Sequence, residues 1–242
     1  MQQNNVKENL QIVRDEINEA CLKAGRSCNS VKLCAVSKFH PIEAVEEAIK
    51  SEQFLFGENR VQEAFEKFKQ LKEKNYNFNL HIIGSLQTNK VKKALEVASC
   101  IQSVDRIELL QEIEKQCCRF NNGQGRDIDI LFEIHTGEDS KSGYTSKDEL
   151  KKNLELLAEG NFPHIKCQGL MTMAPFTKDE ILIHKSFSTL RELSIELAKD
   201  FPLLNFSQLS MGMSGDFKIA IEEGSTMVRI GTAIFGQRDY NK

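Results

Sequence analysis

The feature that most constrains the fold is a regular alternation of short apolar segments with longer segments of helical periodicity. Eight apolar segments take part, at residues 31–37, 54–56, 80–83, 100–104, 128–134, 165–171, 205–209 and 227–230. Strands that alternate with helices pair in parallel, so we expect an α/β fold, most economically a single closed (β/α)8 barrel of the TIM type. An open doubly wound sheet is the alternative.

One more helix is expected before the first strand. Apolar residues from Val6 to Ala24 recur at steps of three or four, and the pattern stops at Gly25. The units follow one another without a long linker or a low-complexity stretch. Because a chain of 242 residues suits one α/β barrel, we expect residues 1–242 to form a single domain.

Composition and charge disfavour several classes of function. The chain is 40% hydrophobic and 28% charged, and its formal net charge is −3, with the basic residues spread along the chain. These values argue against intrinsic disorder and against non-specific binding to nucleic acids or anionic membranes. No apolar run approaches the roughly 18 residues that span a bilayer. The polar start does not resemble a signal peptide, so we expect a cytoplasmic protein.

The cysteine spacings predict no metal site, and the chain lacks the common nucleotide-binding motifs. Seven cysteines, an odd number, are expected to be reduced thiols. They form no Cys-x-x-Cys pair and none of the Cys/His spacings of structural zinc sites. The chain also has no Gly-x-Gly-x-x-Gly after its first strand and no Walker motif.

Barrel geometry directs the search for a site to the carboxyl ends of the strands. The first apolar run leads directly into Lys38, which places a lysine at the mouth of the barrel. Burial there would favour the neutral amine that a Schiff base with an aldehyde needs. A solvated lysine at a strand end explains the same position, so position alone leaves both readings open.

The second strand also leads into polar residues, Glu58 and Asn59. Asn59 fits a helix cap as well as a ligand contact. Glu58 is the best-placed carboxylate for a third kind of protein, a phosphate-binding barrel isomerase with a general base. That reading leaves Lys38 and Arg229 without a role.

The last two strands lead into loops of small residues. Strand seven is followed by residues 210–216, of sequence Ser-Met-Gly-Met-Ser-Gly-Asp, and strand eight ends around Arg229, Gly231 and Thr232. Peptide N–H groups and hydroxyls in two adjacent loops can hold a phosphate dianion, although two capped turns explain the same residues. A lysine on strand one with such a phosphate site suits an aldehyde cofactor that carries a phosphate, and pyridoxal 5'-phosphate (PLP) is the candidate.

At these residues the sequence resembles the pyridoxal phosphate homeostasis protein family. The matching stretches are Ala-Val-Ser-Lys-Phe-His-Pro (35–41), Phe-Gly-Glu-Asn-Arg-Val-Gln-Glu (56–63), His-Ile-Ile-Gly-Ser-Leu-Gln-Thr-Asn-Lys (81–90), Gly-Leu-Met-Thr-Met (169–173), Leu-Ser-Met-Gly-Met-Ser (209–214) and Val-Arg-Ile-Gly-Thr-Ala-Ile-Phe-Gly (228–236). The resemblance runs from about Val31 to the end of the chain and implies the PLP-binding barrel of the alanine racemase fold, fold type III.

The resemblance also implies roles for individual residues. Lys38 would form the Schiff base with PLP, and Asn59 would lie beside the cofactor ring. Arg229 would face the pyridine nitrogen and keep it unprotonated, which weakens the ring as an electron sink. The phosphate would be held through hydroxyls and backbone amides of Ser210, Met211, Gly231 and Thr232.

The implied function is PLP binding and homeostasis of intracellular vitamin B6, with effects on amino-acid balance and without catalytic turnover. PLP-dependent apo-enzymes are the implied recipients, and we expect a monomer. A PLP-dependent amino-acid racemase is the alternative. Racemases add a β-rich domain with a catalytic tyrosine, for which this chain has no equivalent after its eighth unit. Tyr144, in the loop 137–145 that also holds Lys141, is the tyrosine we place near the mouth.

Overall fold

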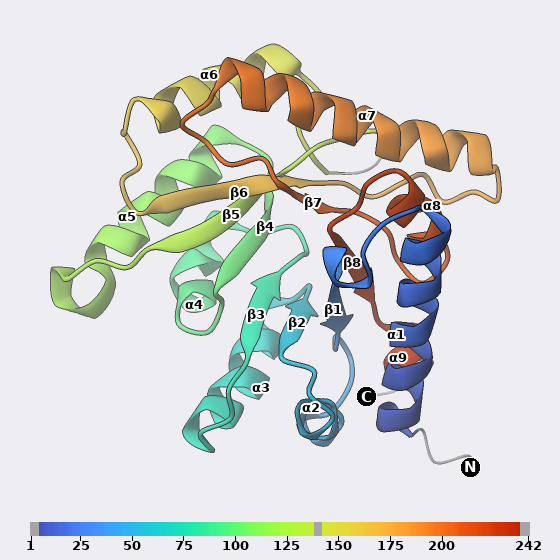
Figure 1. Ribbon diagram of the computed structural model, residues 1–242. Coiled ribbons are helices and arrows are strands. Elements are labelled where there is room, and N and C mark those ends of the chain that lie inside the picture. The colour runs from blue at the N-terminus through green and yellow to red at the C-terminus, as the bar shows by residue number, and fades with distance from the viewer. Residues whose placement is uncertain (1–4, 138–141, 238–242) are drawn as a thin grey trace.

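Eight parallel strands form a closed barrel in the computed structural model, which describes residues 5–137 and 142–237 (Figure 1). The strands are β1 Lys32–Val36, β2 Leu55–Glu58, β3 Asn79–Ile82, β4 Cys100–Val104, β5 Ile128–Glu133, β6 Ile165–Met171, β7 Gln208–Ser210 and β8 Met227–Ile230. They are hydrogen-bonded in chain order, and β1 pairs with β8. The predicted closed barrel is therefore confirmed.

Helices follow the strands around the outside of the barrel (Figure 1). The α-helices are α1 Val6–Lys23, α2 Ile42–Lys50, α3 Val61–Glu73, α4 Val91–Leu95, α5 Ile107–Gly123, α6 Lys147–Ala158, α7 Glu180–Asp200, α8 Phe217–Glu222 and α9 Thr232–Phe235, with 3-10 turns η1 Cys28–Ser30 and η2 Thr88–Lys90. No helix within the described residues is both long enough and apolar enough to cross a membrane.

The helix before the first strand, α1, covers the closing side of the barrel. Asn5 caps it by accepting a hydrogen bond from the Glu8 backbone N–H. One face of α1 is buried, including Leu10, Val13 and Ile17. The helix packs against α8 and α9, which lie beside it in Figure 1. The predicted extra helix therefore covers the last helices of the barrel.

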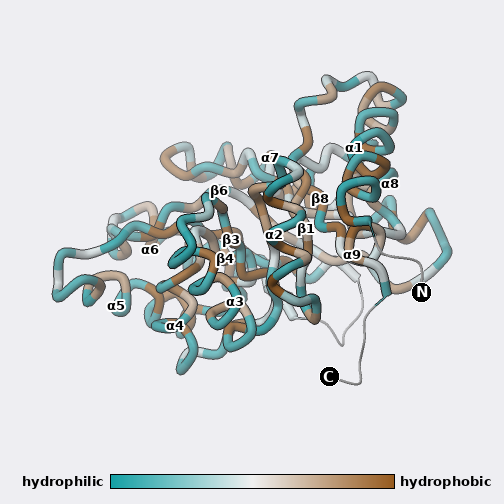
Figure 2. The backbone as a smooth tube through the Cα atoms, turned by 90° about the horizontal axis from the view of Figure 1, so that it is seen from below, coloured by the Kyte–Doolittle hydropathy of each residue, from teal (hydrophilic) through white to brown (hydrophobic). Residues whose placement is uncertain are grey.

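Apolar burial follows the strands. In Figure 2, brown hydrophobic segments lie among the strands, and brown alternates with teal along the surrounding helices. All of β4 and β8 is buried, as expected for parallel strands that are covered on one face by helices and fill the barrel with the other.

Strand β7 is shorter than the sequence pattern predicts. It begins at Gln208 rather than at Asn205. The Asn205 side-chain oxygen accepts a hydrogen bond from the Ser207 backbone N–H at 2.9 Å. This local turn competes with strand pairing and delays the start of β7.

The contact between β6 and β7 requires a residue without a side chain. Gly169 lies opposite Gln208, has φ of +152°, and follows an irregularity in the β5–β6 register. A Cβ atom at position 169 would lie 1.9 Å from the Gln208 carbonyl oxygen. The close approach of these two backbones therefore depends on glycine.

We expect Gly169→Ala to lower the free energy of unfolding by about 3 kcal/mol or more, because it adds a backbone clash to an unfavourable φ. Gly160→Ala is the matched control, since Gly160 also has a positive φ of +83° but no atom within 4 Å of its added Cβ. It should lose about 1 kcal/mol. Urea unfolding measures both, and equal losses would show that the β6–β7 contact does not need glycine.

Candidate functional site

A cavity of about 330 Å³ opens at the carboxyl ends of the strands. Five of the seven predicted site residues line it: Lys38, Asn59, Arg229, Gly231 and Thr232. They come from the loops after β1, β2 and β8 and from β8 itself. The structure thus brings together residues that are almost 200 positions apart in the sequence.

The turn that carries Lys38 is held by a buried cation beneath it. Lys67 on α3 is 7% exposed, and its ammonium group donates to the Ser37 carbonyl oxygen at 2.8 Å. The Lys67 ammonium also bonds to the carboxylates of Glu58, at 2.8 Å, and Glu63, at 3.1 Å. The Glu63 carboxylate in turn accepts the Phe39 backbone N–H at 2.6 Å. These contacts fix the backbone on both sides of Lys38.

The Glu58 carboxylate is bonded within this network and does not face the barrel mouth. The carboxylate is fully buried, and besides Lys67 it accepts the Ser37 hydroxyl at 2.8 Å. Burial raises the pKa of Glu58, and the nearby ammonium of Lys67 partly opposes that rise. Glu58 does not line the cavity, which removes support for a barrel isomerase that uses it as a general base.

Arg229 is held rigidly in the cavity wall. Its side chain is 4% exposed, and Nη1 donates to the carbonyl oxygen of Ser210 at 2.6 Å and to the Ser210 hydroxyl at 2.8 Å. Nη2 donates to the Thr172 carbonyl oxygen at 2.8 Å. Burial lowers the pKa of Arg229, but a guanidinium stays charged in proteins. Nε–H and one N–H of Nη2 have no acceptor among residues 5–137 and 142–237.

Two loops on the cavity wall present unused backbone donors. Within the described chain, the N–H groups of Ser214, Gly215, Gly231 and Thr232 donate to no acceptor, and neither do the hydroxyls of Ser214 and Thr232. The first loop is joined to β8 by a hydrogen bond from the Arg229 backbone N–H to the Gly212 carbonyl oxygen at 2.9 Å. Such a concentration of donors suits a phosphate dianion.

Gly231 lets the second loop approach the end of β1. A Cβ atom at this position would lie 2.9 Å from the Val36 carbonyl oxygen. The loop after β8 therefore packs against the strand that leads into Lys38. Because of this close packing, Lys38 and the N–H donors of Gly231 and Thr232 line the same cavity.

Asn59 adds an unsatisfied polar atom to the cavity wall. Its side-chain oxygen is buried and has no hydrogen-bond partner among the described residues. Buried polar atoms in proteins are almost always paired, so an unpaired one at a cavity marks a contact for a ligand donor. Asn59 does not cap α3, whose N-cap residue is Arg60.

Ser210 and Met211 do not line the cavity. The Ser210 side chain turns into the barrel, where its hydroxyl donates to Gln102 Oε1 at 2.6 Å and accepts from Arg229. The Met211 side chain is fully buried, and its backbone N–H already bonds to the Met227 carbonyl oxygen at 3.1 Å. Ser210 therefore positions Arg229, and a direct contact of Ser210 or Met211 with a phosphate stays a prediction.

Ser214 and Gly215 were not among the predicted site residues. They lie four residues beyond Ser210 and Met211 in the same small-residue loop and line the cavity. The run of small residues from 210 to 216 contained the signal. Which of its residues face the cavity depends on where β7 ends, and the residue pattern alone does not fix that end.

Tyr144 pairs with Ile134 just after the end of β5, but its side chain points away from the cavity of Lys38. Its ring packs edge-on against Phe132, and its hydroxyl accepts a hydrogen bond from the Asn153 amide at 2.7 Å. Burial raises the pKa of this phenol. The side chain is 4% exposed and does not line the cavity of Lys38. Lys141, from the same loop, lies outside the described residues.

Comparisons with known proteins agree with this architecture. Residues 4–239 match the family model "Alanine racemase, N-terminal domain". The chain is 40% identical over 236 residues to the pyridoxal phosphate homeostasis protein of Aquifex aeolicus, covering 98% of this chain and 100% of that one. Its identity to the protein of that name from Escherichia coli K12 is 36% over 244 residues, covering 99% of each.

Solved structures show the same fold. PipY of Synechococcus elongatus, solved with PLP bound, has a TM-score of 0.82 and 32% identity, and the match covers 96% of this chain and 100% of that one. Clostridium difficile alanine racemase has a TM-score of 0.74 at 13% identity, with 98% of this chain and 57% of the racemase matched. The second likeness concerns the barrel fold alone. On the identities over the full length, the chain belongs to the pyridoxal phosphate homeostasis protein family.

Proposed function

We propose that this protein binds PLP at the cavity of Lys38 and acts in PLP homeostasis as a carrier without catalytic turnover. One observation carries the proposal: Lys38 and two loops of unused N–H and hydroxyl donors line the same cavity. That arrangement suits a small molecule with an aldehyde at one end and a phosphate at the other. Membership of the family, and the PLP-bound structure of PipY, support the choice of PLP.

The residues of the site divide the work of binding. The Lys38 amine would bond to the aldehyde carbon as a Schiff base, with release of one water molecule. The donors of Ser214, Gly215, Gly231 and Thr232 would hold the phosphate. The Asn59 side-chain oxygen can accept a ring hydroxyl, and the remaining N–H groups of Arg229 can donate to the pyridine nitrogen.

Arg229 argues for storage rather than catalysis. When bound, PLP supplies an electron sink whose strength depends on a protonated pyridine nitrogen. A permanently charged guanidinium cannot accept a proton, so Arg229 opposite that nitrogen would keep it unprotonated. Its three protein contacts, to Ser210 and Thr172, keep the guanidinium in place.

Racemisation also needs two acid–base groups on opposite faces of the substrate. Among the described residues that line the cavity, the ionisable side chains are Lys38, Asp216 and Arg229. The Asp216 carboxylate already accepts the Met213 backbone N–H at 2.5 Å. Tyr144, the tyrosine considered as an acid, is buried and does not line the cavity, which favours a carrier over a racemase.

The proposal also covers where the protein acts, its oligomeric state and the recipients of PLP. We propose that a cytoplasmic monomer holds PLP and releases it to PLP-dependent apo-enzymes. The open cavity at the barrel mouth would leave the bound aldehyde within reach of solvent and of competing amines. Exchange of the Schiff base with another amine transfers the cofactor without any net chemical change.

The first prediction concerns the attachment point. Borohydride reduction of PLP-loaded protein should place the added mass on the peptide that contains Lys38, because that amine lines the cavity with the phosphate donors. Mass spectrometry locates the modification, and Lys38→Ala should abolish it. Lys90→Ala, a change at an exposed lysine after β3, should leave the labelling intact. Specific labelling of Lys90 or Lys141 in the native protein would refute the assignment.

The second prediction concerns the phosphate donors. Thr232→Ala and Ser214→Ala should each weaken PLP binding about tenfold, since a hydrogen bond to a charged group contributes about 1.5 to 3 kcal/mol. Thr189→Ala, which removes an exposed hydroxyl on α7, is the control and should bind like the parent. Equilibrium titrations with PLP measure the Kd of all three variants. If both site variants bind PLP as tightly as the wild-type protein does, these loops do not hold the phosphate.

The third prediction concerns turnover. The PLP-loaded protein should not exchange the α-proton of L-alanine at an enzymatic rate, because Tyr144, the tyrosine considered as the second acid–base group, does not line the cavity. Incubation in deuterium oxide followed by NMR and chiral chromatography gives the rate, with free PLP as the background. Deuteration or D-alanine formation at about 1 per second would establish a racemase instead and would make Asp216 the acid to test.

A further inference from the structure

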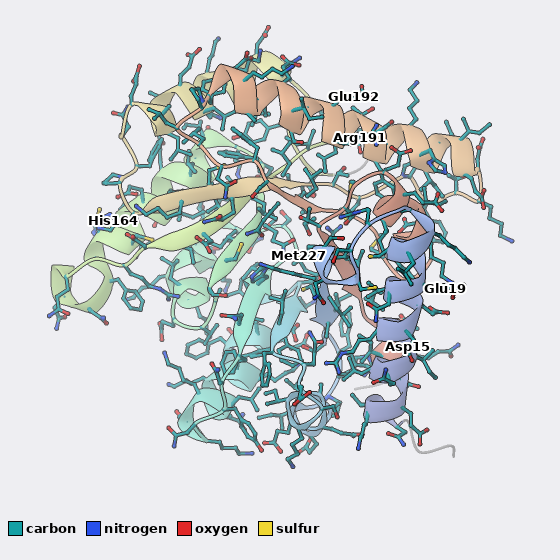
Figure 3. All side chains as sticks on the ribbon, in the orientation of Figure 1. Asp15, Glu19, His164, Arg191, Glu192 and Met227 are labelled. Atoms are coloured by element: carbon teal, nitrogen blue, oxygen red, sulfur yellow. The ribbon has the colours of Figure 1, made fainter. Side chains whose placement is uncertain are left out.

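Three metal-ligating side chains converge at the opposite end of the barrel from the Lys38 cavity. Glu114 and Cys118 lie one turn apart on α5, and His164 lies in the segment between α6 and β6. Figure 3 labels His164 where β6 begins, close to α5. Their ligand atoms all lie within 4.8 Å of one another. This is the one such cluster found among the described residues.

The separations between these atoms suit a tetrahedral cation. With a Zn–S bond of about 2.3 Å and a Zn–N bond of about 2.0 Å, the sulfur and nitrogen of a tetrahedral site lie about 3.5 Å apart. The Cys118 Sγ and His164 Nδ1 atoms are 3.6 Å apart. The Glu114 Oε1 atom lies 3.1 Å from the sulfur and 2.7 Å from the nitrogen, so it would need to move back by about half an ångström to complete the site.

The carboxylate and the imidazole are anchored from behind. The second oxygen of Glu114, Oε2, accepts the His164 backbone N–H at 3.1 Å, which leaves Oε1 facing the cluster. Glu114 is 8% exposed, and a Cβ atom at Gly125 would lie 2.6 Å from the His164 ring. Held on two sides, these groups form a pre-arranged pair of ligands. Cys118 is exposed, so solvent can reach the fourth position.

A catalytic cysteine explains the same residues less well. Both the Cys118 thiol and the Glu114 carboxylate contact the same ring nitrogen, Nδ1 of His164. A proton relay from thiol to carboxylate needs the two different nitrogens of the ring. The hydrogen bond to Glu114 also raises the pKa of the Cys118 thiol, which disfavours the reactive thiolate.

We propose that Glu114, Cys118 and His164 bind a borderline-soft divalent cation of the Zn²⁺ type, with water in the fourth position. On binding, the Cys118 thiol releases its proton to solvent and ligates as the thiolate, and His164 ligates through Nδ1 with its proton on Nε2. The ion would link α5 to the start of β6. The site lies at the amino ends of the strands, so it does not involve the PLP cavity.

Cobalt titration tests the site in the full-length protein after treatment with chelator and reductant. Co²⁺ should produce a thiolate-to-cobalt charge-transfer absorption that Zn²⁺ displaces. Cys118→Ser should lose this band, and His164→Gln should weaken Co²⁺ binding at least about tenfold. Cys28→Ser is the matched control, because Cys28 is a partly exposed thiol outside the cluster, and it should keep the band.

A second measurement does not depend on any variant. Zn²⁺ should slow the alkylation of Cys118 by iodoacetamide in the wild-type protein and leave the alkylation of Cys28 unchanged, as measured by peptide mass spectrometry. The proposal is overturned if Co²⁺ gives no thiolate band, if the band survives in Cys118→Ser, or if Zn²⁺ does not protect Cys118.

Discussion

The pairing of β1 with β8 is the constraint on which the site depends. It closes the barrel through the register Lys32↔Met227 to Ala35↔Ile230, and it sets the end of the first strand beside the end of the last. Lys38 and Thr232 then line one cavity although they are 194 residues apart. Without closure, the lysine and the phosphate donors would lie on opposite edges of an open sheet.

Buried polar groups then fix the site without occupying it. Lys67, together with Glu58 and Glu63, holds the turn around Lys38. The buried charges of Lys67 and Glu58 are tolerated because they pair with each other, and removing one partner would leave an uncompensated charge. On the other side, Ser210 and Thr172 hold the Arg229 guanidinium. The cavity is thus pre-organised, which lowers the entropy cost of binding a small ligand.

Whether a predicted site residue lines the cavity depends on where its strand ends. Lys38, Asn59, Arg229, Gly231 and Thr232 line the cavity as expected, although their contacts with a cofactor stay predictions. Ser210 does not line the cavity, because it is the last residue of a three-residue strand and alternate side chains of a strand point to opposite faces. A shift of the strand end by a few residues therefore changes which side chains reach the ligand.

The sequence by itself determined the barrel, the first helix and the region of the site, because apolar periodicity is local and recurs in every strand and helix. It also carried the family resemblance through motifs that all fall at strand ends. Only the tertiary structure decided that Tyr144 packs inside, that Ser214 lines the cavity, and that His164 meets Glu114 and Cys118. Those outcomes depend on contacts between residues far apart in the sequence, and side-chain packing in three dimensions sets such contacts, whereas local pattern does not.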